Sequence, residues 1–101
     1  MTESLGIIET IGYTAAIQAA DAAVKAAKIS LGETLKVGGG KVNVIIRGDV
    51  AAVKAAVEAG VKAASRIGKV ESEVIIPRPS DKLSPVFPIE ARTQGAKGKT
   101  K

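Results

Sequence analysis

The residues best suited to chemistry in this sequence are three consecutive glycines, Gly38, Gly39 and Gly40, with Lys36 and Lys41 close on either side. Backbone N–H groups and lysine ammonium groups together could bind an anion such as phosphate. The same residues could instead form a plain hairpin turn, because glycine tolerates positive φ. They could also line a passage in which the backbone lies close to a passing solute.

A nucleotide-binding P-loop does not fit this glycine run. That motif needs G-x-x-x-x-G-K-[ST] between a strand and a helix, whereas here Val42 follows the lysine and a strand is predicted after the glycines. The hairpin is the better interpretation on position alone. Three glycines are nevertheless more than a turn requires, so we expect the backbone itself to approach another group closely.

Two residue types on which many enzyme mechanisms depend are missing. The chain contains no cysteine and no histidine, which excludes thiolate catalysis, disulfides and cysteine-ligated zinc, and removes the commonest general base and metal ligand. The glutamates are scattered among predicted strands, and nothing couples them into an acid–base pair. We therefore predict a protein that is not an enzyme and that holds no cofactor and no metal.

The rest of the composition limits which kinds of partner this protein could bind. The first ten residues lack the basic and apolar regions of a signal peptide, and no apolar run approaches the length of a membrane span, so we expect a cytosolic protein without membrane contact. The net charge of +5 is concentrated in the ending ARTQGAKGKTK, which we interpret as a solvated, disordered tail. An RNA-binding module would need aromatic residues on its central strands, and these strands have none, so nucleic acid is disfavoured as a partner.

The elements that must position the glycine run follow from hydrophobic periodicity. Asp49 is placed to cap one helix and Gly68 to end it. The predicted order is strand 5–10, helix 13–28, strand 29–37, strand 41–48, helix 50–67 and strand 69–77. This β-α-β-β-α-β order predicts an α+β, ferredoxin-like fold, an antiparallel sheet with two helices on one face. We expect one domain over residues 1–79 and a short C-terminal extension with the basic tail over residues 80–101.

Each predicted helix shows an apolar stripe at helical spacing. In the first helix, the predicted buried residues are Tyr13, Ile17, Ala20, Val24 and Ala27. In the second, they are Val50, Val53, Val57, Val61 and Ala64. Gln18, Asp21, Lys25 and Lys28 would form the polar face of the first helix, with Asp21 four residues before Lys25.

Arg78 lies between two prolines, Pro77 and Pro79, just after the last predicted strand. Proline fixes its own φ and restricts the residue before it. The arginine could be an exposed residue behind a strand terminator, or a pre-organised side chain that docks into a partner at little entropic cost. Spacing alone does not separate these interpretations.

Four segments together resemble a known family. They are GIIET, AAIQAADAAVKAAKI, KVGGGKVNVIIRGDVAAVKAAVEAG and VIIPRP. In a match that runs from about residue 5 to residue 79, they resemble the bacterial microcompartment shell proteins of the single-domain, hexamer-forming class. The resemblance implies a ferredoxin-like domain whose copies form flat hexagonal discs. Such discs tile into the facets of a cytoplasmic, polyhedral shell around enclosed enzymes, and serve as a wall with pores rather than as a catalyst.

The resemblance also implies what the glycine run does. Val37, Gly38, Gly39 and Gly40 would border the central pore of the disc, with Lys36 and Lys41 flanking them. Exposed N–H groups and rings of lysine charge would favour small polar or anionic metabolites. Relatives often carry a serine where this chain has Gly39, so a hydroxyl would be lost and the opening would be wider.

Three further positions would lie where discs meet. The resemblance places Lys25 at the disc edge near its own copy and Arg78 in the neighbouring disc, and a lysine at Lys28 adds charge to the same edge. The implied partners are further copies in a homohexamer and other shell proteins. Two rivals remain at this stage: a regulatory domain on the same fold that binds an anion or nucleotide, and a nucleic-acid binder that uses the basic tail.

Overall fold

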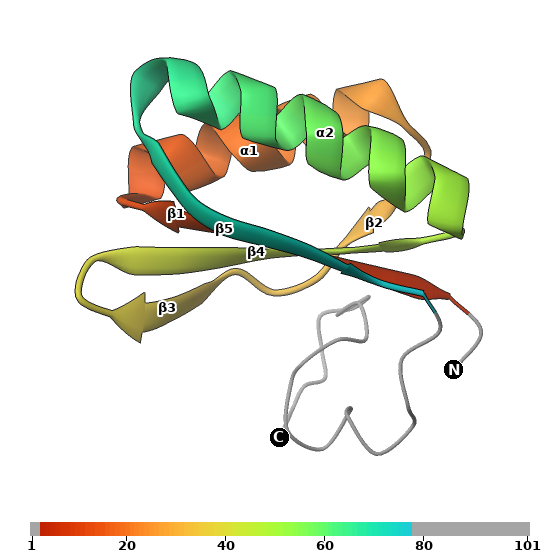
Figure 1. Cartoon of the computed structure of the whole chain (residues 1–101), viewed down its shortest axis with the longest axis horizontal. Helices are drawn as coiled ribbons and strands as arrows, with labels where there is room; N and C mark the ends of the chain where they lie inside the picture. The colour runs from red at the N-terminus through yellow and green to blue at the C-terminus, as the bar shows by residue number, and fades with distance from the viewer. Residues whose placement is uncertain (1–2, 78–101) are drawn as a thin grey trace.

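The computed structural model describes residues 3–77, in which strands and helices form two layers (Figure 1). The elements in chain order are β1 (Ser4–Ile11), α1 (Tyr13–Ala26), β2 (Ser30–Leu31), β3 (Leu35–Gly38), β4 (Lys41–Gly48), α2 (Val50–Ile67) and β5 (Lys69–Ile76). Arg78, the extension 80–101 and the basic tail lie outside the described residues.

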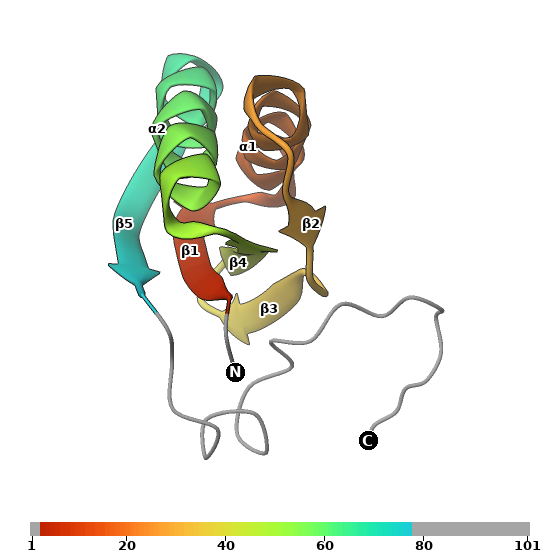
Figure 2. The same cartoon turned by 90° about the vertical axis from the view of Figure 1, so that its right-hand side faces the viewer.

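The sheet is antiparallel and has the strand order β2-β4-β1-β5, with β3 also paired to β4. Both helices lie on one face of this sheet, with α1 above the β2 side and α2 above the β5 side (Figure 2). The predicted α+β fold, an antiparallel sheet with two helices on one face, is therefore confirmed.

One predicted strand, residues 29–37, is wrong as a continuous element. It is divided into β2 and β3, which pair in succession with the same edge of β4. Leu31 pairs with Ile46 and Leu35 with Asn43, so this segment takes one more residue than β4 over the same stretch, and the ladder is interrupted. The Gly32 amide still donates to the Ile45 carbonyl at 2.7 Å, which keeps the connecting residues against the sheet.

The core lies between the helices and the sheet, and small residues bring the layers close together. A Cβ atom added at Gly6 on β1 would come within 2.8 Å of methyl carbons of both Val53 and Val57 on α2. A Cβ atom at Gly60 on α2 would come within 3.0 Å of the Ala19 carbonyl oxygen on α1. The two helices therefore pack through contacts that only glycine and alanine permit.

The predicted buried stripe of α1 is wrong for its large residues, whereas Ala20 and Ala27 are partly buried against the core. The buried residues of this helix are Ala15, Ala16, Ala19 and Ala23. Tyr13, Ile17 and Val24 instead remain 51%, 55% and 44% exposed. Both sets recur at helical spacing, and the alanine set faces inward because only small side chains fit beside α2.

The second helix follows its prediction more closely. Val53, Val57 and Ala64 are buried, whereas Val50 in the first turn is 41% exposed. The Asp49 carboxylate accepts a hydrogen bond from the Ala52 amide at 2.9 Å, which confirms the predicted cap. The Gly68 amide donates to the Ala64 carbonyl at 2.9 Å where the helix ends.

Candidate functional site

The glycine run forms the turn of the β3–β4 hairpin. Gly38 pairs with Lys41, which leaves Gly39 and Gly40 as a two-residue turn. The φ angles of Gly38, Gly39 and Gly40 are +89°, +62° and +78°. Positive φ at both central residues is what a type I′ hairpin turn needs. The expectation that three glycines exceed the need of a turn is therefore wrong, because all three adopt a backbone conformation that favours glycine.

The turn is tied to the junction between β1 and α1. The Gly12 amide donates to the Gly40 carbonyl at 2.7 Å. The buried Thr10 hydroxyl donates to the Gly12 carbonyl at 3.1 Å. Sequence analysis missed these anchoring residues, since Thr10 reads only as one more strand position. The hairpin tip is thus held at the N-terminal end of α1.

Around its three glycines, the hairpin tip leaves open space on the side where side chains would stand. A Cβ atom added at Gly38, Gly39 or Gly40 would meet nothing within 4 Å. Val37, which precedes them, is 48% exposed. Apart from the Gly12 amide, a group that approaches this turn must therefore come from outside the described residues.

The two lysines beside the glycines lie on opposite faces of the sheet. Lys36 pairs with Val42, and the Val42 side chain lies in the core under the helices, so Lys36 shares the helix-covered face of the sheet. Lys41 directly precedes Val42 on β4, and its side chain therefore points to the opposite face. The Lys36 ammonium lies 5.2 Å from the centre of the Tyr13 ring at the start of α1, within the range of a cation–π interaction. The structure therefore brings Lys36 to α1 and separates it from Lys41.

Lys25 and Lys28 lie at the opposite end of α1. The Lys25 ammonium pairs with the Asp21 carboxylate at 2.9 Å, as the spacing predicted, and both side chains remain largely exposed. Lys28 is exposed just beyond the helix, which ends at Ala26 rather than at residue 28. A helix of 14 residues spans about 20 Å, so these lysines lie far from the hairpin tip. The predicted site at Arg78 lies outside the described residues.

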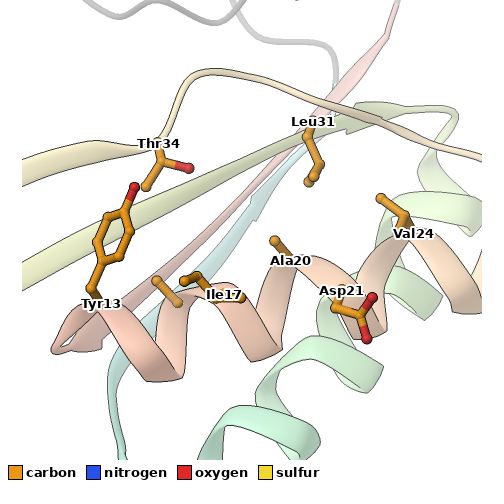
Figure 3. A pocket seen from close by; sticks show the side chains of 8 residues that line it. Tyr13, Ile17, Ala20, Asp21, Val24, Leu31 and Thr34 are labelled. Atoms are coloured by element: carbon orange, nitrogen blue, oxygen red, sulfur yellow. The ribbon is translucent and has the colours of Figure 1, made fainter.

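An open groove of about 270 Å³ runs along the outer side of α1 (Figure 3). We call it the α1 groove. Its walls come from α1, from the end of β2 and from the segment that joins β2 to β3. They consist of Tyr13, Ala16, Ile17, Ala20, Asp21, Val24, Leu31 and Thr34. Sequence analysis assigned the large members of this set to the core, so it missed the groove.

The described residues offer no other obvious chemical site. Within residues 3–77, no three histidine, cysteine, aspartate or glutamate side chains gather in a way that could hold a metal ion. None of the helices in that range is both long and apolar enough to cross a membrane. The features available for function are therefore the hairpin tip, the lysines at the far end of α1 and the α1 groove.

Comparison with known proteins points to one family. The family described as "BMC domain" matches residues 4–79. The bacterial microcompartment shell protein EutM of Salmonella typhimurium is 53% identical over 87 residues, which cover 86% of this chain and 91% of the relative. The shell protein PduA of Citrobacter freundii is 51% identical over 85% of this chain and 92% of its own length. The carboxysome shell protein CcmK2 of Synechocystis is 48% identical over 88% of both chains.

A solved structure has the same fold. It is the crystal structure of a microcompartment protein from Desulfitobacterium hafniense, which matches with a TM-score of 0.73 and 38% identity. The match covers 82% of this chain and 45% of the other, so this chain corresponds to about half of that protein.

Proposed function

The chain belongs to the BMC domain family, and on that premise we propose how its residues build a shell. It is a structural shell protein of a bacterial microcompartment. In our proposal, its copies form a homohexameric disc without catalytic activity, and Val37, Gly38, Gly39 and Gly40 border a central metabolite pore. Discs then join one another and other shell proteins at an edge that contains Lys25, Lys28 and Arg78.

The observation that carries this proposal is the placement of the two sites at opposite ends of α1. The 2.7 Å hydrogen bond from Gly12 to Gly40 holds the hairpin tip at the start of this helix, and Lys25 lies in its last turn. A disc subunit needs one end at the central axis and the other at the rim. With α1 directed roughly along the radius of the disc, both needs are met by one rigid element.

The pore chemistry follows from the hairpin. Glycine leaves the backbone open, so the tips of all subunits can converge without side chains filling the space between them. Backbone N–H groups around such an opening would favour polar and anionic solutes. Lys41 would add one positive charge per subunit on the sheet face opposite the helices, whereas Lys36 is engaged with Tyr13.

The rival function, a regulatory domain that grips an anion or nucleotide at the glycine run, has less support. Within residues 3–77, nothing beyond the adjacent residues lies within 4 Å of where a Cβ would stand at the three turn glycines, so this part of the chain builds no enclosing wall for a ligand. An anion-binding nest would need such a wall or further converging donors. In the pore proposal, the hairpins of the neighbouring copies supply that wall.

The test is native mass spectrometry of the purified full chain together with electron microscopy. We expect a hexamer and discs with central openings that extend into sheets or tubes. A stable monomer, dimer or trimer without larger assemblies would contradict the proposal. In that case, binding of inorganic phosphate and nucleotides would be measured next, to examine the regulatory rival.

A further inference from the structure

We propose that residues 83–89 of the same chain cover the sheet face opposite the helices, and that Asn43 on β4 accepts a hydrogen bond from this segment. We call this side of the sheet the open face, because no helix of residues 3–77 lies on it (Figure 2). The inference concerns a single subunit, so it goes beyond the proposed function and does not depend on the hexamer.

The open face carries an apolar cluster that is separate from the core under the helices. Ile8 and Val44 pair with each other and belong to that core. Alternation along the strands therefore directs the neighbouring pair, Ile7 and Ile45, to the open face. The whole cluster consists of Leu5, Ile7, Leu35, Ile45 and Ile76. Large aliphatic side chains gathered on one sheet face are unfavourable in water, so this face needs a cover.

The centre of the cluster is buried as deeply as the core itself. Ile45 is 0% exposed and Leu5 is 1% exposed. Arg47, which pairs with the Glu3 carboxylate at 2.6 Å, lies beside Leu5 at one end of the cluster. Side chains on the neighbouring strands stand beside Ile45 rather than over it. Its complete burial therefore requires a further layer on the open face.

The open face also holds a buried hydrogen-bond acceptor without a donor. Asn43 lies between Val42 and Val44 of the core, so its side chain is directed to the open face. Its cross-strand partner on β3 is Leu35, a member of the cluster. Within residues 3–77, the Asn43 Oδ1 atom is buried and accepts no hydrogen bond. Buried polar atoms are nearly always paired, so the layer over this face should also bring a donor.

Residues 83–89 have the composition and the reach to form this layer. The large apolar residues of this segment, which are the only ones after Pro77, are Leu83, Val86, Phe87 and Ile89. The segment follows β5, whose last residue, Ile76, is itself a member of the cluster. The chain from Ile76 to Phe87 can extend over about 36 Å, whereas β4 lies only about 10 Å from β5 across β1.

The segment can also supply the missing donor. Each of its residues except Pro85 and Pro88 carries a backbone N–H group, and Ser84 adds a hydroxyl. Because the segment is joined to the edge of the open face, its effective concentration there is on the order of millimolar. A second copy of the chain would have to compete with this tethered segment, so the segment is the better occupant.

The test uses the absence of cysteine in the chain. Ile45→Cys in the full chain would react with a water-soluble maleimide at a rate that reports how often the open face is uncovered. Adding Phe87→Asp should raise this rate at least about tenfold, because a carboxylate in the segment disfavours its packing on an apolar face. Adding Thr93→Asp, beyond the segment, is the matched control and should leave the rate unchanged. Circular dichroism should show all these variants folded.

Two outcomes of this labelling would overturn the inference. The first is an equal rate with Phe87→Asp and with Thr93→Asp. The second is an Ile45→Cys rate that falls as the protein concentration rises, because a second copy would then form the cover. Neither outcome bears on the proposed function, which the native mass of the unaltered chain tests separately.

The reactivity of the segment itself gives a second measurement, which needs no inserted charge. Phe87→Cys in the full chain should react with the maleimide at least about tenfold more slowly than Thr93→Cys, because only the first position would lie against the sheet. Equal rates at the two positions would contradict the inference.

The role of Asn43 is tested by Asn43→Leu in the Ile45→Cys chain. Leucine keeps the size of the side chain but removes the acceptor, so the donor of the segment would be buried without a partner. We expect the maleimide reaction to become about fivefold faster. Ser72→Ala is the control, since Ser72 is exposed on β5 and shares the open face through its pairing with Glu9. An unchanged rate in Asn43→Leu would overturn the assignment of Asn43 as the acceptor.

Discussion

The two helices lie on the same face of the sheet, yet they use their large apolar residues in opposite ways. On α2, Val53 and Val57 are buried against the sheet. On α1, Ile17 and Val24 are exposed, and the buried residues are alanines. The difference teaches that α2 supplies large side chains to the core of the subunit, whereas α1 fits beside it with small residues and leaves its large ones exposed.

The largest expected effect on stability comes from adding a bulky side chain where the two helices touch. Gly60→Val should lower the free energy of unfolding by about 3 kcal/mol, because its Cβ would press against the Ala19 backbone, which cannot yield as a side chain could. Urea unfolding at one fixed protein concentration measures this. Ala55→Val, at an exposed position on the same helix, is the control and should cost less than about 1 kcal/mol. Equal losses would mean that the helices can move apart.

A matched pair of truncations tests the comparison directly. Val53→Ala should lower the free energy of unfolding by about 2 kcal/mol, since two buried methyl groups are lost and a cavity remains. Val24→Ala should change it by no more than about 0.5 kcal/mol in the dissociated subunit, because Val24 is already exposed there. Both would be measured by urea unfolding under conditions that keep subunits apart. A larger loss from Val24→Ala would place that residue in the core after all.

Smaller effects on stability are expected at the far end of α1. Lys25→Ala removes an exposed ion pair with Asp21, which contributes only about 0.3–0.5 kcal/mol to the helix. Hexamers should therefore persist while sheets of discs diminish in electron micrographs, and Arg78→Ala should act in the same way. Lys54→Ala, on the exposed side of α2, is the control. Sheets unchanged by the first two substitutions would remove these residues from the disc edge.

The smallest effect on folding is expected at the hairpin. Lys41→Glu should leave hexamers intact but slow the passage of anions through assembled shells, since one positive charge per subunit becomes negative. Uptake of a small anionic dye by shells reports this. Lys36→Glu is the comparison, and it should affect passage less because Lys36 lies against Tyr13. Unaltered passage in Lys41→Glu would mean that this side chain points away from the pore axis.

Sequence reasoning predicted the element order and the hairpin because these depend on residues close together in the chain. The β-α-β-β-α-β order then predicted both helices on one sheet face. The Asp49 cap joins residues three positions apart, and the ion pair of Asp21 and Lys25 spans one helical turn. The placement of Lys25 and the glycine turn on their elements followed from the same short-range rules.

The parts decided only by tertiary structure involve partners far apart in the chain. In α1, the alanine stripe and the Tyr13–Ile17–Val24 stripe both match the helical period, and Gly60 on another helix decides which one faces inward. The division into β2 and β3 depends on their register with β4, and the Glu3–Arg47 ion pair joins residues 44 positions apart. Short-range periodicity determines where helices and strands form, whereas the side chain that fits against a distant element is set by packing between elements.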